Sequence, residues 1–272
     1  MPSTPRGQRT RSLIIDRTAA VFDQQGFAGA TLTQLVAATG LTRGAFYFHF
    51  DSKDALAEAI VQRQQERWLP IVDELKAAEP DPLRRLLRLT FRHGTLFQGD
   101  LVMRAGSRLM TERSLIRREL WRSYPWWIDA TRSLLAEAAD ELPDTSALAS
   151  AGWPAPEQVP PGVPRGLAAL AEHLVGMWAG VLQQSTAAGQ DDLPDRVRAS
   201  WIATLPLLCS SPERRQELTA LVEELSTQMR EAGRQRADSG LEPKIDPLAD
   251  IEDVHKGLAD DEYEDEDEEL AG

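Results

Sequence analysis

Residues 26–53 read GFAGATLTQLVAATGLTRGAFYFHFDSK, and this stretch decides the fold. Thr31 begins a short apolar helical pattern, and Gln34 three positions later completes a capping box. Gly40 ends that pattern, and Thr42 follows as the N-cap of another short helix. Two short helices joined by a tight glycine turn predict a helix-turn-helix.

The second helix of this pair is the one that would enter a DNA major groove by its N-terminal end. Arg43 can fork onto guanine or phosphate, Gly44 lets the backbone approach closely, and Ala45 can touch a thymine methyl group. Other side chains are placed to reach phosphates: Thr31, Thr33, Thr42, Tyr47, His49 and Lys53. The spacing of Phe46 and Phe50 equally fits an ordinary helical hairpin with aromatic rings in its core.

The rest of the chain also has helical periodicity and no alternating strand pattern, so the predicted class is all-α. A first helix is expected over residues 9–26, ending at Gly26 in the left-handed conformation. A long helix begins after Asp51 or Ser52 and reaches about Leu69, where Pro70 follows. Further helices are expected at 82–97, 101–111, 114–141, 166–188, 193–208 and 212–236.

The charge of the chain is unevenly distributed. The total is −13, but the 14 acidic residues after Ser239 face only Lys244 and Lys256, so this end alone carries −12. Residues 1–53 contain six basic and three acidic side chains, a net +3. This asymmetry indicates a nucleic-acid face at one end and a solvated tail at the other.

Several classes of protein are excluded by what the sequence lacks. No apolar run is long enough to span a membrane, and the polar start MPSTPRGQRTRS is not a secretory signal, so a cytoplasmic location is expected. The single cysteine, Cys209, lies in an apolar run and is expected to be buried and inert. The four histidines lie on separate segments without metal-ligand spacing, and no nucleophile set or phosphate loop occurs. We therefore expect neither an enzyme nor a metal or cofactor site.

Residues 26–53 resemble the signature of the TetR family of repressors. The string GAFYFHF at 44–50, followed by Ser52 and Lys53, is similar to the γ-butyrolactone receptor branch of that family. The resemblance continues more weakly over about residues 8–210. It implies a dimer that binds palindromic double-stranded operator DNA and leaves it when a lactone-like inducer binds.

The resemblance also places the ligand. Trp127 aligns with the tryptophan that contacts the lactone in that branch, although plain core packing is an alternative for this residue. Gln64, on the long helix, is a candidate hydrogen-bond donor to a ligand carbonyl, and a solvated glutamine is the alternative for this residue. Candidate wall residues, each of which can equally be core, are Trp68, Met103, Leu109, Met110 and Trp178.

The dimer face is expected on residues 166–188 and 193–208. Large apolar residues recur there at helical spacing, and Gly176 and Gly180 permit close approach. The stripe can also be intrachain core; its members are Leu167, Leu170, Leu174, Met177, Trp178 and Val181.

The predicted organisation has three regions. Residues 1–53 form the helix-turn-helix domain, with the start of a connecting helix at 52–69. Residues 54–236 form a helical ligand-binding and dimerisation domain, interrupted by a proline-rich irregular connection at 142–166. Residues 237–272 form a disordered acidic tail that solvates the chain or competes with DNA for the basic end.

The predicted function is therefore a ligand-responsive transcriptional repressor. A second hypothesis keeps the DNA-binding domain but makes the protein a ligand-blind or antibiotic-sensing pseudo-receptor. Titration of a ligand against operator binding separates the two. In this family the controlled genes are often those of antibiotic biosynthesis, which the resemblance implies and the residues do not show.

Overall fold

The computed structural model describes residues 4–120, 123–150, 154–187 and 192–239, and they contain helices but no strand. The chain forms two compact units. The first comprises Met1–Val61 and Ala105–Glu119, and the second comprises Gln62–Arg104 and Leu120–Pro243. Residues 240–272, which make up nearly all of the predicted acidic tail, lie outside the described residues. The all-α class is confirmed.

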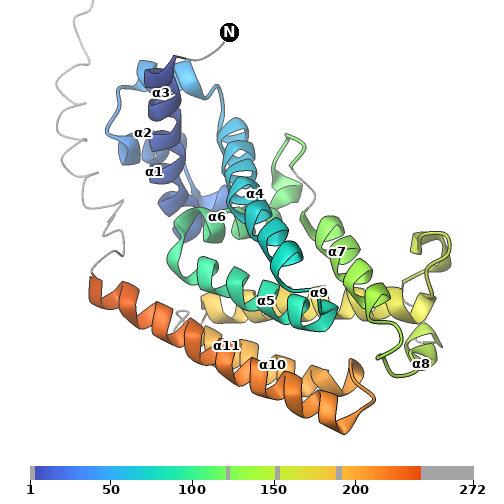
Figure 1. Ribbon diagram of the computed structural model, residues 1–272. Helices are drawn as coiled ribbons and strands as arrows, with labels where there is room; N and C mark the ends of the chain where they lie inside the picture. Colours follow the sequence, from blue (N-terminus) through green and yellow to red (C-terminus); the bar gives the residue numbers. More distant parts are fainter. Residues whose placement is uncertain (1–3, 121–122, 151–153, 188–191, 240–272) are drawn as a thin grey trace, which may run out of the picture. The chain divides into compact units, whose positions relative to one another are not determined.

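The first unit is built from α1 (Pro5–Gly29), α2 (Leu32–Thr39), α3 (Arg43–His49) and the beginning of α4 (Lys53–Ala78). Figure 1 shows α1, α2 and α3 gathered at the N-terminal end of the chain. The end of α6 (Leu101–Thr111) and the 3-10 turn η1 (Arg113–Leu115) belong to the same unit. Its buried side chains include Ile14, Val21, Phe22, Leu35, Phe46, Phe50, Leu56 and Ile60.

The second unit contains the rest of α4 and α6 and all the remaining helices. These are α5 (Pro82–Gly99), α7 (Ser123–Glu137), α8 (Ser146–Ser150), α9 (Arg165–Ala187), α10 (Leu193–Thr204) and α11 (Pro212–Ser239), with 3-10 turns η2 (Pro156–Gln158) and η3 (Leu205–Leu207). The helix α11 runs beside α5 and α10, and α9 packs against α7, α8 and α10 (Figure 1). One hydrophobic core lies between them and includes Trp68, Leu87, Leu135, Leu170, Trp201 and Val222.

Local capping signals in the first unit are confirmed. Thr31 and Gln34 form the predicted capping box, Gly40 is left-handed at φ 66°, and the Thr42 hydroxyl accepts a hydrogen bond from the Ala45 amide. Gly26 does adopt a positive φ of 70°, but its ψ of −175° is not that of a left-handed cap. It is instead a break inside α1, which resumes helical hydrogen bonding up to Gly29.

Two predicted helix boundaries are wrong. The helix α4 does not end at Leu69 but continues through Pro70 to Ala78. Pro70 is exposed, whereas Trp68 before it and Ile71 after it contact the same core. Packing on both sides of the proline outweighs the hydrogen bond lost there, a penalty of about 3 kcal/mol.

The single helix expected over 114–141 is also wrong. Residues 116–120 are not helical, and α7 spans only Ser123–Glu137. The Arg117 amide donates to the Asp54 carboxylate at 2.6 Å, and Arg118 forms ion pairs with Asp51 and Glu58. The partners in these contacts lie 60 or more residues earlier in the sequence, so helical periodicity could not reveal them. The described residues of 142–164 are irregular as expected, apart from α8 and η2, and α9 begins at Arg165.

Candidate nucleic-acid interface and ligand site

Helix α3 separates its residues into a buried and an open face. Phe46 is fully buried and Phe50 is 2% exposed, so both rings are core. Arg43, Gly44 and Ala45 are exposed. A Cβ added at Gly44 would meet no atom within 4 Å, which leaves the backbone of this turn open to close approach.

The polar side chains predicted to reach phosphates differ in their surroundings. Thr31, Thr33 and Thr42 are exposed, although the hydroxyls of Thr31 and Thr42 also cap their own helices. The Arg43 guanidinium lies 5.7 Å from the centre of the Tyr47 ring, so the two lie together on the first turns of α3. Both Tyr47 and His49 are half-buried.

Lys53 makes more contacts within the chain than the sequence predicts. Its Nζ donates to the carbonyls of Phe27 and Ala30 at 2.7 and 2.9 Å and lies 4.4 Å from the centre of the Phe27 ring. Two of its three N–H groups are therefore used to fasten the segment after Gly26. A phosphate contact would have to use the remaining donor.

Phe48 is the residue of this face that the sequence analysis missed. Its side chain is 85% exposed, the most exposed large hydrophobic side chain of the described residues. It lies one turn after Gly44 and Ala45 on the same side of α3. The signal was present, because Phe46 and Phe50 point inward and the residue between them must point outward.

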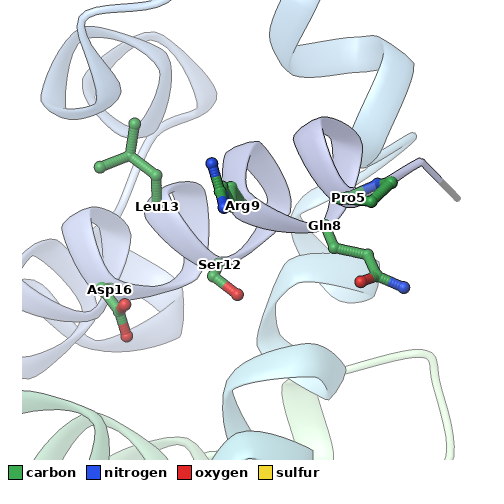
Figure 2. A pocket seen from close by; sticks show the side chains of 6 residues that line it. All are labelled: Pro5, Gln8, Arg9, Ser12, Leu13 and Asp16. Carbon is green, nitrogen blue, oxygen red and sulfur yellow. The ribbon is translucent and has the colours of Figure 1, made fainter.

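A shallow open hollow runs along the start of α1. Figure 2 shows that all the side chains lining it come from this one helix. They are Pro5, Gln8, Arg9, Ser12, Leu13 and Asp16. Since a single helix provides the lining, the hollow is a surface feature and does not have the enclosed apolar walls of a small-molecule site.

The second unit brings three of the predicted ligand residues together around one histidine. The ring centre of His93 lies 5.0 Å from that of Trp68, 5.6 Å from that of Trp127 and 5.6 Å from that of Trp178, each in an edge contact. Trp127 also stacks at a tilt on Trp68, with 4.9 Å between centres. His93 on α5 was not predicted, because a lone histidine in a helical pattern carries no signal of its own.

Burial controls the state of this histidine. His93 is only 6% exposed, and burial lowers the pKa of its imidazole to about 4. No charged neighbour contributes to that shift. The ring is therefore uncharged at neutral pH and offers one hydrogen-bond donor and one acceptor.

The remaining predicted ligand residues are all buried. The Gln64 amide donates from Nε2 to the Met103 carbonyl at 3.1 Å, and both residues are buried in the second unit. Leu109 and Met110 are buried too, but they belong to the first unit. Their assignment to a ligand wall stays a prediction.

The expected dimer stripe lies mostly in the core. Leu167, Leu170, Leu174 and Val181 belong to the hydrophobic cluster of the second unit and cannot also face a partner. Among the described residues of α9, those that are exposed are His173, Gly176, Gln183, Gln184 and Thr186. The stripe predicted from sequence is the more hydrophobic face of this helix, which the neighbouring helices of the same chain cover.

The described residues contain neither a metal-binding cluster nor a membrane-spanning helix. Within the described ranges no three histidine, cysteine or acidic side chains are grouped so as to hold a metal ion. No described helix is both long and apolar enough to cross a membrane. Cys209 is buried as expected, and burial raises the pKa of its thiol.

Comparison with known proteins supports the assignment of the N-terminal helices to a DNA-binding domain. The similarity also extends over most of the chain. Residues 14–60 match the model of the family described as bacterial regulatory proteins, tetR family. The A-factor receptor protein of Streptomyces griseus is 27% identical over 252 residues, which cover 88% of this chain and 80% of that protein.

Solved structures are similar over most of their length. A γ-butyrolactone receptor (ArpA-like protein) superposes with a TM-score of 0.65 at 26% identity, covering 82% of this chain and 99% of that one. CprB of Streptomyces coelicolor, solved in complex with its biological operator sequence, gives a TM-score of 0.67 at 27% identity, covering 81% and 98%.

Proposed function

Because this chain belongs to the TetR family of bacterial regulatory proteins and is similar along its length to γ-butyrolactone receptors, we propose that it is a dimeric repressor released from its operator by a small molecule. It acts on DNA in the cytoplasm and not as an enzyme. The observation that carries the proposal is the open face of α3, where Arg43, Gly44, Ala45 and Phe48 lie exposed on a helix held by two buried phenylalanines.

The chemistry of that face suits a major groove. The Arg43 guanidinium offers paired donors to guanine or phosphate, and its neighbour Tyr47 supports it. Phe48 and Ala45 offer apolar contact to thymine methyl groups. The exposed hydroxyls of Thr31 and Thr33, at the start of α2, can reach phosphates.

A dimer would use the side of α9 and α10 that their own unit leaves open. A Cβ added at Gly176 or Gly180 would meet no atom within 4 Å, so another helix can approach there. Ala199, Ala203 and Leu207 continue this open side on α10 and the turn after it. The α9 and α10 helices of two subunits would form a four-helix contact. This contact would hold the α3 helices of the two subunits apart by about one turn of DNA, ~34 Å.

The inducer would act through α4. Residues 53–61 of this helix belong to the first unit and residues 62–78 to the second, so one helix carries both Lys53 and Trp68. We call the rings of Trp68, His93, Trp127 and Trp178 the tryptophan cluster. A ligand bound there can release DNA only to the extent that it binds more tightly to the conformation that does not fit the operator. Lactones are the first compounds to test, since the relatives are named for them.

The alternative is a repressor that answers to no lactone or to an antibiotic. One observation favours it: the rings of Trp68, His93, Trp127 and Trp178 already fill the centre of the cluster with one another. Titration of γ-butyrolactones against a preformed operator complex decides between the two.

The test of DNA recognition begins with selection of binding sites from random duplex DNA by the full chain. We expect a palindromic site. Arg43→Ala and Tyr47→Ala should each weaken binding to it by roughly tenfold to a hundredfold, as expected for loss of a guanine or phosphate contact. Arg92→Ala is the matched control, because Arg92 is an exposed arginine on α5 whose only ion pair, with Glu74, spans 3.7 Å. Unchanged binding by both α3 variants would refute the proposed interface.

A further inference from the structure

Two polar atoms inside the tryptophan cluster have no hydrogen-bond partner among the described residues. They are Nδ1 of His93 and the indole Nε1 of Trp68, on side chains that are 6% and 2% exposed. A buried polar group left unpaired is unfavourable, and such a group calls for a specific cause such as a ligand that pairs with it. Here two of them lie on rings in direct edge contact, with 5.0 Å between ring centres.

The surroundings of these two atoms are aromatic. Trp68 and His93 are buried, whereas Trp127 and Trp178 are half-buried. The half-buried ring of Trp127, on α7, contacts both buried rings and also that of Trp126. Movement of the Trp127 ring would therefore open a path to both polar atoms without moving the core helices.

The burial of this site disfavours a charged occupant. His93 and Trp68 are 6% and 2% exposed, and no charged side chain contributes to the lowered pKa of His93. An unpaired charge transferred to such a place would cost far more than a neutral group. A hydroxyl or a carbonyl, by contrast, can accept from the Trp68 N–H, and a hydroxyl can also donate to the imidazole.

We propose that His93 Nδ1 and Trp68 Nε1 are the polar anchor of a binding site for an uncharged, mostly apolar small molecule with one hydroxyl or carbonyl group. The site is closed in the free protein by Trp127 and opens when that ring moves aside. As the inducer site of a repressor it rests on the proposed function, but the existence and chemistry of the site do not. It also accounts for why the centre of the cluster is filled in the structure.

The test uses a pair of probes of equal shape. In p-cresol one methyl group of p-xylene is replaced by a hydroxyl, so the difference in their affinities reports the polar anchor alone. Binding to the full chain is followed by NMR through the indole ¹H–¹⁵N signals, with that of Trp68 assigned by its loss in Trp68→Phe. The variants are His93→Phe and Trp68→Phe, which keep a ring but remove the imidazole nitrogens and the indole N–H, respectively.

Trp201→Phe is the matched control. Trp201 is also buried at 2% exposure with an unpaired Nε1, but it lies on α10 and contacts none of the cluster rings described above. Circular dichroism confirms that each variant is folded before it is titrated.

We expect p-cresol to bind the unaltered chain at least about tenfold more tightly than p-xylene and to shift the Trp68 indole signal. His93→Phe and Trp68→Phe should each remove most of that preference, and Trp201→Phe should retain it. Equal affinity for the two probes, binding of neither, or a preference that survives both substitutions would overturn the inference. Operator binding without probe is measured on the same samples, so a failure of DNA recognition with the preference intact would count against the proposed function alone.

Discussion

The carboxylate of Glu112 accepts a hydrogen bond from the backbone amide of Ala28 at 3.0 Å, although the two residues are 84 positions apart in the chain. The other oxygen of Glu112 pairs with Arg108, which in turn donates to the Asp23 carbonyl at 2.6 Å. The two groups held in this way, the Ala28 amide and the Asp23 carbonyl, lie on either side of Gly26, the break in α1. The end of α6 thus holds this break in place within the first unit.

Gly26→Ala should destabilise the first unit for two reasons. A positive φ costs a residue with a side chain about 1–2 kcal/mol, and the new methyl group would overlap the Glu112 carboxylate. We expect a total loss of roughly 2 kcal/mol or more, measured as a lower urea midpoint. Gly40→Ala is the control, since Gly40 has φ 66° but no atom within 4 Å of an added Cβ. Equal losses in the two variants would mean that the Glu112 contact contributes nothing.

Gly44→Ala should separate stability from recognition. The position is helical and its Cβ direction is empty, so alanine should leave the stability unchanged or raise it by about 0.5–1 kcal/mol. The same methyl group would stand between α3 and the DNA, and we expect operator affinity to fall by about tenfold or more in an electrophoretic shift. Gly233→Ala on α11, where the nearest atom is 3.9 Å away, should leave operator binding unchanged. Full affinity of the Gly44 variant would show that the backbone does not approach the groove there.

Gly180→Trp should abolish the dimer while the subunit stays folded. No described residue has an atom within 4 Å of a Cβ at this position, so the bulk is accommodated in the monomer but not between two close-packed helices. Sedimentation velocity should show a shift from dimer to monomer. Gln216→Trp, at an exposed position of α11, is the control of equal bulk and should remain dimeric. A dimeric Gly180 variant would place the interface elsewhere.

Acid should destabilise the second unit through His93. Its pKa is about 4 in the fold against 6.5 ordinarily, so the unfolded chain takes up a proton at this residue before the folded chain does. Stability from this residue is therefore complete above pH 6.5 and is lost as the pH falls toward 4, by roughly 3 kcal/mol in all. Urea titrations at pH 7.5 and pH 5 should show a smaller drop for His93→Phe than for the unaltered chain, by about 2 kcal/mol. Equal drops would mean that His93 is hydrated or paired.

The elements predicted correctly from sequence are those whose signals are local. Thr31 with Gln34, Gly40 and Thr42 each act on a backbone group within three residues, and a helix-turn-helix is assembled from such steps. The inward direction of Phe46 and Phe50 follows from their spacing. The open face of α3 then follows by geometry, including Phe48, which was overlooked.

Contacts distant in sequence explain what was missed. The carbonyl partners of Lys53 lie 23 and 26 residues before it, and the acidic partners of residues 117 and 118 lie about 60 residues before them. No periodicity encodes such pairs. The choice between dimer face and core for α9 likewise depends on which neighbours cover each side, and the continuation of α4 past Pro70 depends on the core that both flanks contact.

The open ring of Phe48 has a thermodynamic consequence. Wherever that ring meets a partner, apolar surface leaves water, and the heat capacity of the complex falls below that of the separated molecules. Added salt weakens the attraction between the cationic side chains and the phosphates but does not weaken the burial of the apolar Phe48 surface. Complex formation through α3 should accordingly retain a salt-insensitive remainder, and that remainder should shrink when Phe48 is replaced by serine.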